Sequence, residues 1–399
     1  MAPAIRIEEP SPSKSPSGGM ALWALGFRPL YLCAGIFAAL AIALWVGHFS
    51  GWLGAGAYLR DPLWHAHEMI FGYTFAVVVG FLFTAVRNWT GQPTPDGAVL
   101  AGIVALWVAA RVLLALDLPR PSLVADLLFA VAAAWGIGRP LFAANNRRNL
   151  FFVGLLLAIG AANALFVAAV SGSVALAPRR MLTLALDLVL FIMVVMGGRV
   201  IPMFTANAVP QASPRRPEWL ERAAPASILM LLVADLIMLP LPLTAIFAGL
   251  AAAAQGLRLY LWHPWHTWRR PILWILHASY AWIVLHLALR AWGGVDASVV
   301  SLATHALTVG GIGGLTLGMM TRTARGHTGR MLTAGMPELA AYALVQLAAV
   351  VRVLVPLAVP AWTLAAIEVS GALWVAAFAV FVVAYAPILW RPRIDGKPG

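Results

Sequence analysis

The sequence predicts an all-α fold, a polytopic membrane bundle of about twelve transmembrane helices. Hydrophobic residues make up 62% of the 399 residues, charged residues make up 11%, and the mean hydropathy is +0.86. Soluble domains contain roughly a quarter charged residues, and a soluble core of this size would not bury so much apolar surface. The apolar residues also fall in stretches of about 20, the length that crosses a hydrocarbon core about 30 Å thick.

Twelve apolar stretches are expected to form these helices. In chain order they lie near 29–49, 63–86, 97–116, 122–142, 149–171, 179–204, 223–240, 242–262, 270–291, 298–321, 336–357 and 361–389. The seventh and eighth are separated only by a Leu-Pro-Leu-Pro segment, the narrowest of the divisions. We therefore expect a single membrane domain over 21–390, between a disordered cytoplasmic tail at 1–20, rich in Pro and Ser, and a short cytoplasmic tail at 391–399.

The distribution of Arg and Lys predicts that both termini are cytoplasmic. Of the 27 basic residues, 19 fall on the side of the N-terminus, five on the opposite side and three inside spans. Basic residues concentrate in cytoplasmic loops. Because they are scattered over short loops and not gathered on one face, the net charge of +12 does not indicate a nucleic-acid partner. The single cysteine, Cys33, excludes a disulfide framework and a Cys-based zinc site.

The second span opens with the run Trp-His-Ala-His-Glu-Met at 64–69. Ionisable groups inside spans are rare and usually functional, and imidazole is the commonest metal ligand and the usual axial ligand of haem. On a helix His65 and Glu68 share a face, whereas His67 points elsewhere. The two histidines therefore serve two centres, or one is a ligand and the other orients it. The alternative is an interfacial aromatic belt formed with Trp64.

The tenth span contains His305, followed by glycines at 310, 314 and 318 that leave one smooth helix face. This face suits close helix–helix packing and also a flat macrocycle lying beside His305, and the two interpretations are compatible. The span also echoes the second one, because His305-Ala306 matches His65-Ala66 and both spans run from the outside to the inside. A repeat of this kind would place His65 and His305 symmetrically.

The ninth span carries His277 and Tyr280 on one face. His277 is therefore either a ligand or a buried histidine hydrogen-bonded to the tyrosine. His286 follows nine residues later, on the opposite side of the helix, so the two histidines do not share a site. We expect a structural role for His286.

Arginines and acids also occur inside spans. Arg199 in span six is expected either to bind a haem propionate or to pair with Asp187. Acids such as Asp126 either relay protons or pair with Arg111 and Arg352.

Several motifs, in order along most of the chain, resemble the NnrS family of bacterial membrane proteins. They are Gly-Phe-Arg-Pro at 26–29, the run at 64–69, Asn-Trp-Thr-Gly at 88–91, Gly-Arg-Val-Ile-Pro at 198–202, Phe-Thr-Ala-Asn at 204–207, Leu-His at 276–277, and the segment from His-Ala-Leu-Thr-Val-Gly at 305–310 through Gly-His-Thr-Gly-Arg at 326–330.

The resemblance implies a protein of the bacterial inner membrane that contains haem b and copper and is linked to nitric oxide stress and denitrification. The candidate haem and metal ligands are His65, His67, His277 and His305. Glu68 is the nearest acid for proton delivery. Further candidates within the motifs are His327, Asn88 and Asn207.

Nitric oxide, the lipid bilayer and an unidentified electron donor are the expected partners, and the expected function is to bind and reduce nitric oxide. Two alternatives remain at this point. One is a twelve-helix secondary transporter, or a metal or haem exporter that uses histidines as transient ligands. The other is a non-catalytic haem sensor or electron-transfer subunit, which would lack an open coordination position.

Overall fold

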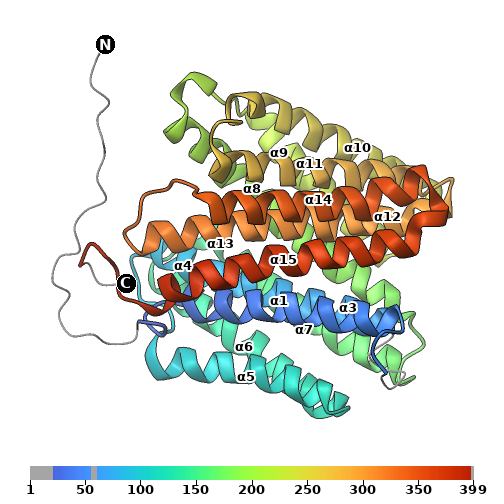
Figure 1. The fold of residues 1–399 in the computed structure, drawn as a ribbon, viewed down its shortest axis with the longest axis horizontal. Coiled ribbons are helices and arrows are strands. Elements are labelled where there is room, and N and C mark those ends of the chain that lie inside the picture. The colour runs from blue at the N-terminus through green and yellow to red at the C-terminus, as the bar shows by residue number, and fades with distance from the viewer. Residues whose placement is uncertain (1–20, 55–60, 397–399) are drawn as a thin grey trace.

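The computed structural model describes residues 21–54 and 61–396, and this part is helical and contains no strand (Figure 1). The first half contains α1 (Phe27–Phe49), α3 (Pro62–His67), η1 (Glu68–Thr74), α4 (Phe75–Thr90), α5 (Gly97–Ala115), α6 (Pro119–Ala143), α7 (Phe151–Val170) and α8 (Pro178–Ala208). The second half contains α9 (Glu218–Leu236), α10 (Leu241–Leu261), α11 (Pro271–Trp292), α12 (Val300–His305), η6 (Ala306–Gly313), α13 (Gly314–His327), α14 (Met336–Ala358) and α15 (Thr363–Trp390). The tail expected at 1–20 lies outside the described residues.

The predicted helical membrane bundle is confirmed. Eleven helical segments of the described chain are long and apolar enough to cross a bilayer. The one predicted span outside these eleven is the seventh, 223–240, which corresponds to α9, a 19-residue helix with two glutamates in its first turn that packs against α8 and α10. The narrow division between the seventh and eighth spans is real: Met238 has a left-handed φ of 57°, and the chain turns there before α10 begins.

The two ends of the described chain meet at one end of the bundle, which we call the terminal end (Figure 1). The Ala21 N–H donates to the Trp390 carbonyl at 2.9 Å. The buried Arg28 side chain donates to the carbonyls of Leu389 at 3.0 Å and Arg391 at 2.8 Å. Helix α1 therefore packs beside α15. The other end, where α3 and α12 begin, is the opposite end.

Two spans share an unusual construction. In one, α3 passes into the π-helix η1 and then into α4; in the other, α12 passes into the π-helix η6 and then into α13. A π-helix is rare and often marks a functional site. One π-helix starts directly after His67 and the other directly after His305. The sequence similarity between spans two and ten is therefore matched in the structure by a π-helix in each span.

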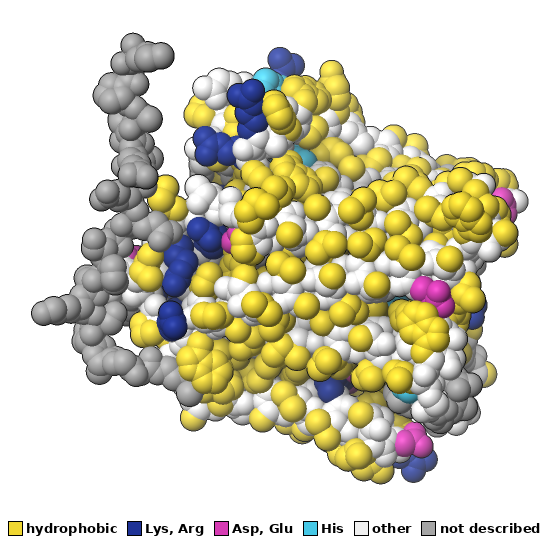
Figure 2. All heavy atoms as spheres, in the orientation of Figure 1, with side chains coloured by type: hydrophobic (Ala, Val, Ile, Leu, Met, Phe, Trp, Pro, Cys, Tyr) yellow, Lys and Arg dark blue, Asp and Glu magenta, His cyan; other side chains and the backbone are white. Residues whose placement is uncertain are grey.

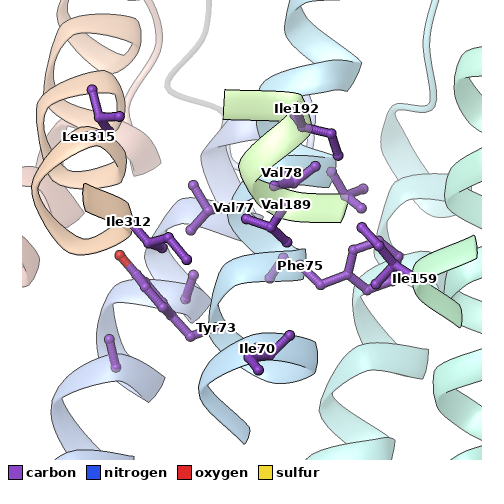
Figure 3. Close-up of a cluster of buried hydrophobic side chains, with 14 of the residues drawn as sticks. Ile70, Tyr73, Phe75, Val77, Val78, Ile159, Val189, Ile192, Ile312 and Leu315 are labelled. Carbon is purple, nitrogen blue, oxygen red and sulfur yellow. The ribbon is translucent and has the colours of Figure 1, made fainter. Parts of the chain in front are cut away.

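The core lies around these two spans, and the outer surface is apolar. Figure 3 shows Tyr73 and Ile312 of the two π-containing spans beside one another, and Val77 beside Val189 of α8. Outside the bundle, hydrophobic side chains cover the visible face, while most of the visible Lys and Arg gather at the terminal end (Figure 2). An apolar belt with charged ends is the surface of a protein that sits in a lipid bilayer.

Candidate functional site

His65 and His305 lie together at the opposite end of the bundle. His305 Nδ1 donates to the Ser301 carbonyl at 2.7 Å, so its Nε2 carries the lone pair and accepts from Arg352 Nη2 at 3.2 Å. His65 stacks on Trp45, with ring centroids 4.2 Å apart. It lies within electrostatic range of both Arg352 and His305. Arg352, which donates to His305, also lies within electrostatic range of His65, and we refer to these residues together as the His65–His305 cluster.

The orientation of His305 is that of a metal-ligating imidazole. Such histidines usually donate one ring N–H to a carbonyl, which fixes the tautomer and aims the other nitrogen at the metal. Here the carbonyl belongs to Ser301, one helical turn earlier in α12. The lone pair of His305 faces a cation, the guanidinium of Arg352.

His67 belongs to a different, fully buried site. Its Nδ1 contacts Glu68 Oε1 at 2.8 Å and its Nε2 contacts Asn163 Oδ1 at 2.8 Å. Asn163 Nδ2 donates to Asp126 at 3.0 Å, and Arg111 Nη2 donates to the same carboxylate at 2.5 Å. Arg111 Nε lies 3.4 Å from Glu68 Oε2 and closes the circle. We call these five residues the His67 circuit.

The hydrogen bonds of the His67 circuit define its charge. Asn163 donates to a carboxylate, so its amide oxygen must face the ring of His67. Both ring nitrogens then face oxygens: Nε2 donates to the Asn163 amide oxygen, and one proton lies between Nδ1 and Glu68 Oε1. The His67–Glu68 pair and the Arg111–Asp126 pair are then each neutral overall, which is what buried polar groups in an apolar span require. Metal ligation by His67 would first have to release Glu68 or Asn163.

His277 is buried in the half of α11 nearer the terminal end. Thr205 donates its hydroxyl to the Ile201 carbonyl, so it accepts from His277 Nε2 at 2.9 Å. His277 Nδ1 is then a buried lone pair with no hydrogen-bond partner among the described residues. The expected alternative, a bond to Tyr280, is wrong, because Tyr280 donates to Gln255. His277 does not join the His65–His305 cluster.

His286 shows a geometry that its sequence position did not indicate. Its Nδ1 donates to the Ala303 carbonyl at 2.8 Å, and its buried Nε2 has no partner in the described part of the chain. Nearby, Arg290 bridges Asp187 at 2.7 Å and Asp235. Asp187 therefore pairs with Arg290, and the expected alternative of a pair with Arg199 is not realised.

Four other sequence candidates lie near the terminal end. Arg199 in α8 lines a cavity there and donates to Asn149 Oδ1 at 2.7 Å. The ring of His327 packs 5.8 Å from Phe27. Asn88 and Asn207 are exposed near the ends of α4 and α8. The structure does not bring these four together with His65 and His305.

The glycine face of the tenth span packs against α11. A Cβ atom at Gly310 would meet Trp282, one at Gly314 would meet Ser279, and one at Gly318 would meet Leu276 at 2.9 Å. Of the two expected readings of this face, close helix–helix packing is the one observed, and the groove is filled by side chains of α11.

The candidate ligands are spread along the bundle. Within residues 21–54 and 61–396, no three His, Cys, Asp or Glu side chains converge in the manner of a metal site. The donors with buried or oriented lone pairs are His305, His277 and His286.

The sequence model of a family described as NnrS protein matches residues 21–393. The chain belongs to the NnrS family. It is thus a multi-pass membrane protein of the nitric oxide response family. No curated protein matches the chain. Both π-containing spans and both histidine sites lie inside the region that defines its membership in NnrS.

Asn163, Trp45 and Arg352 complete the two histidine sites of this NnrS member, and none was a sequence candidate for them. Asn163 had a usable signal, because it is an amide inside a 20-residue apolar helix. Arg352 had one as well, as an arginine within a span. The pairing of Asp126 with Arg111 was one of the expected alternatives, and it is confirmed.

Proposed function

We propose that this NnrS-family protein holds haem b and copper in the bacterial inner membrane, with both termini cytoplasmic, and binds nitric oxide there. The function would protect the cell during denitrification. The observation that carries the proposal is the His65–His305 cluster, in which His305 is fixed by the Ser301 carbonyl with its Nε2 lone pair turned away from the helix backbone.

The donor chemistry of the chain fits these groups. Haem b and copper both accept neutral imidazole nitrogens. His305 Nε2 offers such a nitrogen once Arg352, which donates to it at 3.2 Å, is displaced, and His65 is a second ring in the same cluster. His277 Nδ1 is a further buried nitrogen without a partner in the described residues, and it would serve a separate centre. We therefore assign His305 and His65 to the haem, and His277 to a second metal.

When bound, haem iron would supply a coordination position for nitric oxide, and copper at the separate His277 centre would supply a second redox-active metal. The chain's own residues would orient and supply protons. The Ser301 carbonyl holds the His305 ring, and Trp45 holds the His65 ring by stacking. The His67 circuit holds a proton between His67 Nδ1 and Glu68 Oε1, two and three residues after His65 in the chain.

Reduction of two nitric oxide molecules to nitrous oxide and water consumes two electrons and two protons. The electrons must come from a separate donor, because the described residues contain one free thiol, Cys33, and no disulfide. Glu68 is the acid that we assign to proton delivery.

The decisive experiment is spectroscopic. Full-length protein purified in mild detergent from haem-replete cells should show a Soret band and a haem b pyridine haemochrome, with iron and copper by metal analysis. Addition of nitric oxide should give the EPR signal of a ferrous nitrosyl. Folded protein free of iron would contradict the proposal.

The His67 circuit supports a second candidate, a proton-coupled transporter. Buried carboxylate and histidine chains inside spans are typical of proton relays in pumps and transporters. An iron-free, folded protein would favour this function, because the circuit needs no metal.

A further inference from the structure

Two cavities of about 420 and 310 Å³ open at the terminal end, and they share three arginines. The shared residues are Arg148, Arg199 and Arg216. They come from three separate segments: η2 (Arg147–Asn149) before α7, helix α8, and the loop before α9. We call the joined cavities the basic pocket.

The basic pocket carries a large excess of positive charge. Arg258 also lines it, and Glu221 is the one acid among its lining residues. Glu221 binds Arg258 at 2.7 Å and Arg216 at 3.3 Å. Neither Arg148 nor Arg199 has an ion pair with any described residue. Four arginines and one glutamate leave three uncompensated positive charges.

Arg199 is held in position for a ligand. Its Nη1 donates to Asn149 Oδ1 at 2.7 Å, and the buried Asn149 in turn donates to Asn146 at 3.0 Å. Its guanidinium lies 6.0 Å from the ring centroid of Phe151. The ring of Phe152 lies at a similar distance of 5.9 Å, and the bond to Asn149 uses one nitrogen of the guanidinium. The remaining N–H groups are the fork that binds phosphate oxygens in pairs.

The convergence of like charges needs an explanation. Arg148 and Arg216 both lie within electrostatic range of Arg199. Cytoplasmic loops attract arginines for topology alone, but topology does not require arginines from three segments to face one cavity. Arg199 and Arg258 also lie on helices and not in loops. Mutual repulsion of this kind is relieved by an anion bound between the cations.

We propose that the basic pocket binds a phosphate group carrying at least two negative charges. The excess of three positive charges favours a multiply charged anion over chloride, and the planar fork of Arg favours phosphate. A cavity of about 420 Å³ holds more than an inorganic phosphate. The phosphate comes either from a soluble molecule on the terminal side or from a lipid headgroup in the adjoining leaflet.

The test uses full-length protein in phosphatidylcholine nanodiscs, in buffer free of phosphate and sulfate. Inorganic pyrophosphate is titrated at constant ionic strength, and the melting temperature is followed by tryptophan fluorescence. A second arm replaces part of the lipid with phosphatidic acid. The variants are Arg199→Gln and the more exposed Arg216→Gln, with Arg147→Gln as the matched control, because Arg147 is on the same turn as Arg148 but does not line the pocket.

Wild type and Arg147→Gln should be stabilised saturably, and chloride at the same ionic strength should have no such effect. Each pocket variant should weaken the apparent affinity by about tenfold or more, the loss expected for one charge-assisted contact. A response to pyrophosphate assigns a soluble ligand, and a response to phosphatidic acid alone assigns a lipid headgroup.

Two outcomes overturn the proposal. One is no response to either probe, or an equal response in Arg199→Gln, Arg216→Gln and Arg147→Gln. The other is loss of haem absorbance in Arg199→Gln with an unchanged phosphate response, which would assign this arginine to a haem propionate.

Discussion

The two π-containing spans have the same construction, but their histidines have different surroundings. In the α3–η1–α4 span, both nitrogens of His67 are occupied, by Glu68 and Asn163. In the α12–η6–α13 span, one nitrogen of His305 is tied to its own helix and the other faces Arg352. A histidine whose two nitrogens both face oxygens is part of a structural or proton-holding circuit, whereas His305 Nε2 accepts from Arg352 and can bind a metal through its lone pair once that guanidinium moves away. The same local motif therefore carries two kinds of chemistry.

The sharpest way to break this comparison is to remove each histidine in turn. His305→Ala should abolish haem absorbance per folded protein, because it deletes the oriented lone pair. His67→Ala should leave haem content per folded protein unchanged. The measurement is the pyridine haemochrome divided by the monodisperse protein peak. His266→Ala, at an exposed position of the terminal end, is the control and should behave as wild type. Equal haem loss in His67→Ala and His305→Ala would refute the distinction.

The next largest effect should come from the charge balance of the His67 circuit. Asp126→Asn removes the carboxylate that pairs with the buried Arg111, and breaking a buried ion pair typically costs about 3–5 kcal/mol. Denaturant unfolding in detergent would measure the loss. Glu218→Gln is the matched control, because its partner Arg222 is exposed, and it should cost about 1 kcal/mol or less. An Asp126→Asn protein as stable as wild type would mean that the circuit is not ionic.

A smaller effect is expected from the helix packing beside η6. In Gly310→Ala the new methyl group would meet the ring of Trp282, and overpacking of this kind costs about 1–3 kcal/mol. Gly102→Ala in α5, where no atom lies within 4 Å of the added Cβ, should stay within about 1 kcal/mol of wild type. Thermal unfolding of the pair gives the difference. If Gly310→Ala were as stable as wild type, the glycine face of this span would have free space, and the hypothesis that a macrocycle lies on it would be supported again.

The smallest effect should come from the bond that joins the two spans. Tyr73 donates to Thr316 at 2.5 Å, since the Thr316 hydroxyl itself donates to the Ile312 carbonyl. A double-mutant cycle of Tyr73→Phe and Thr316→Val should give a coupling energy of about 0.5–1 kcal/mol, the range found between membrane helices. Strictly additive losses would show that the two spans are not coupled through this bond.

The sequence predicts the bundle well because span length and hydropathy are local properties. It also predicts that His65 and His305 are placed symmetrically, since the His-Ala pairs repeat at matching depths. The sequence alone did not identify the hydrogen-bond partners of each histidine. Asn163 lies 96 residues from His67, and Arg352 lies 47 residues from His305. Which helix faces which is decided by packing, and hydropathy alone does not encode that choice.

The π-helices illustrate the same limit. The residues at 68–74 and 306–313 do not indicate a π-helix, because the wider turn of a π-helix has no strong amino-acid propensity. It also changes the 100° step on which the helical arguments about faces rested. The prediction that His67 points away from His65 is nonetheless consistent with the structure, since both lie in the regular α3 before the π-helix begins.

Arg28 and the carbonyls of Leu389 and Arg391, to which it donates hydrogen bonds, are synthesised at widely separated times. Arg28 and Leu389 are separated by 361 residues along the chain. At about 5–20 residues per second, roughly 20–70 s pass between the synthesis of Arg28 and that of Leu389. Helix α1 therefore lies in the membrane without this neighbour until α15 has been synthesised. The position of α1 is fixed by a helix that emerges from the ribosome about a minute or less later.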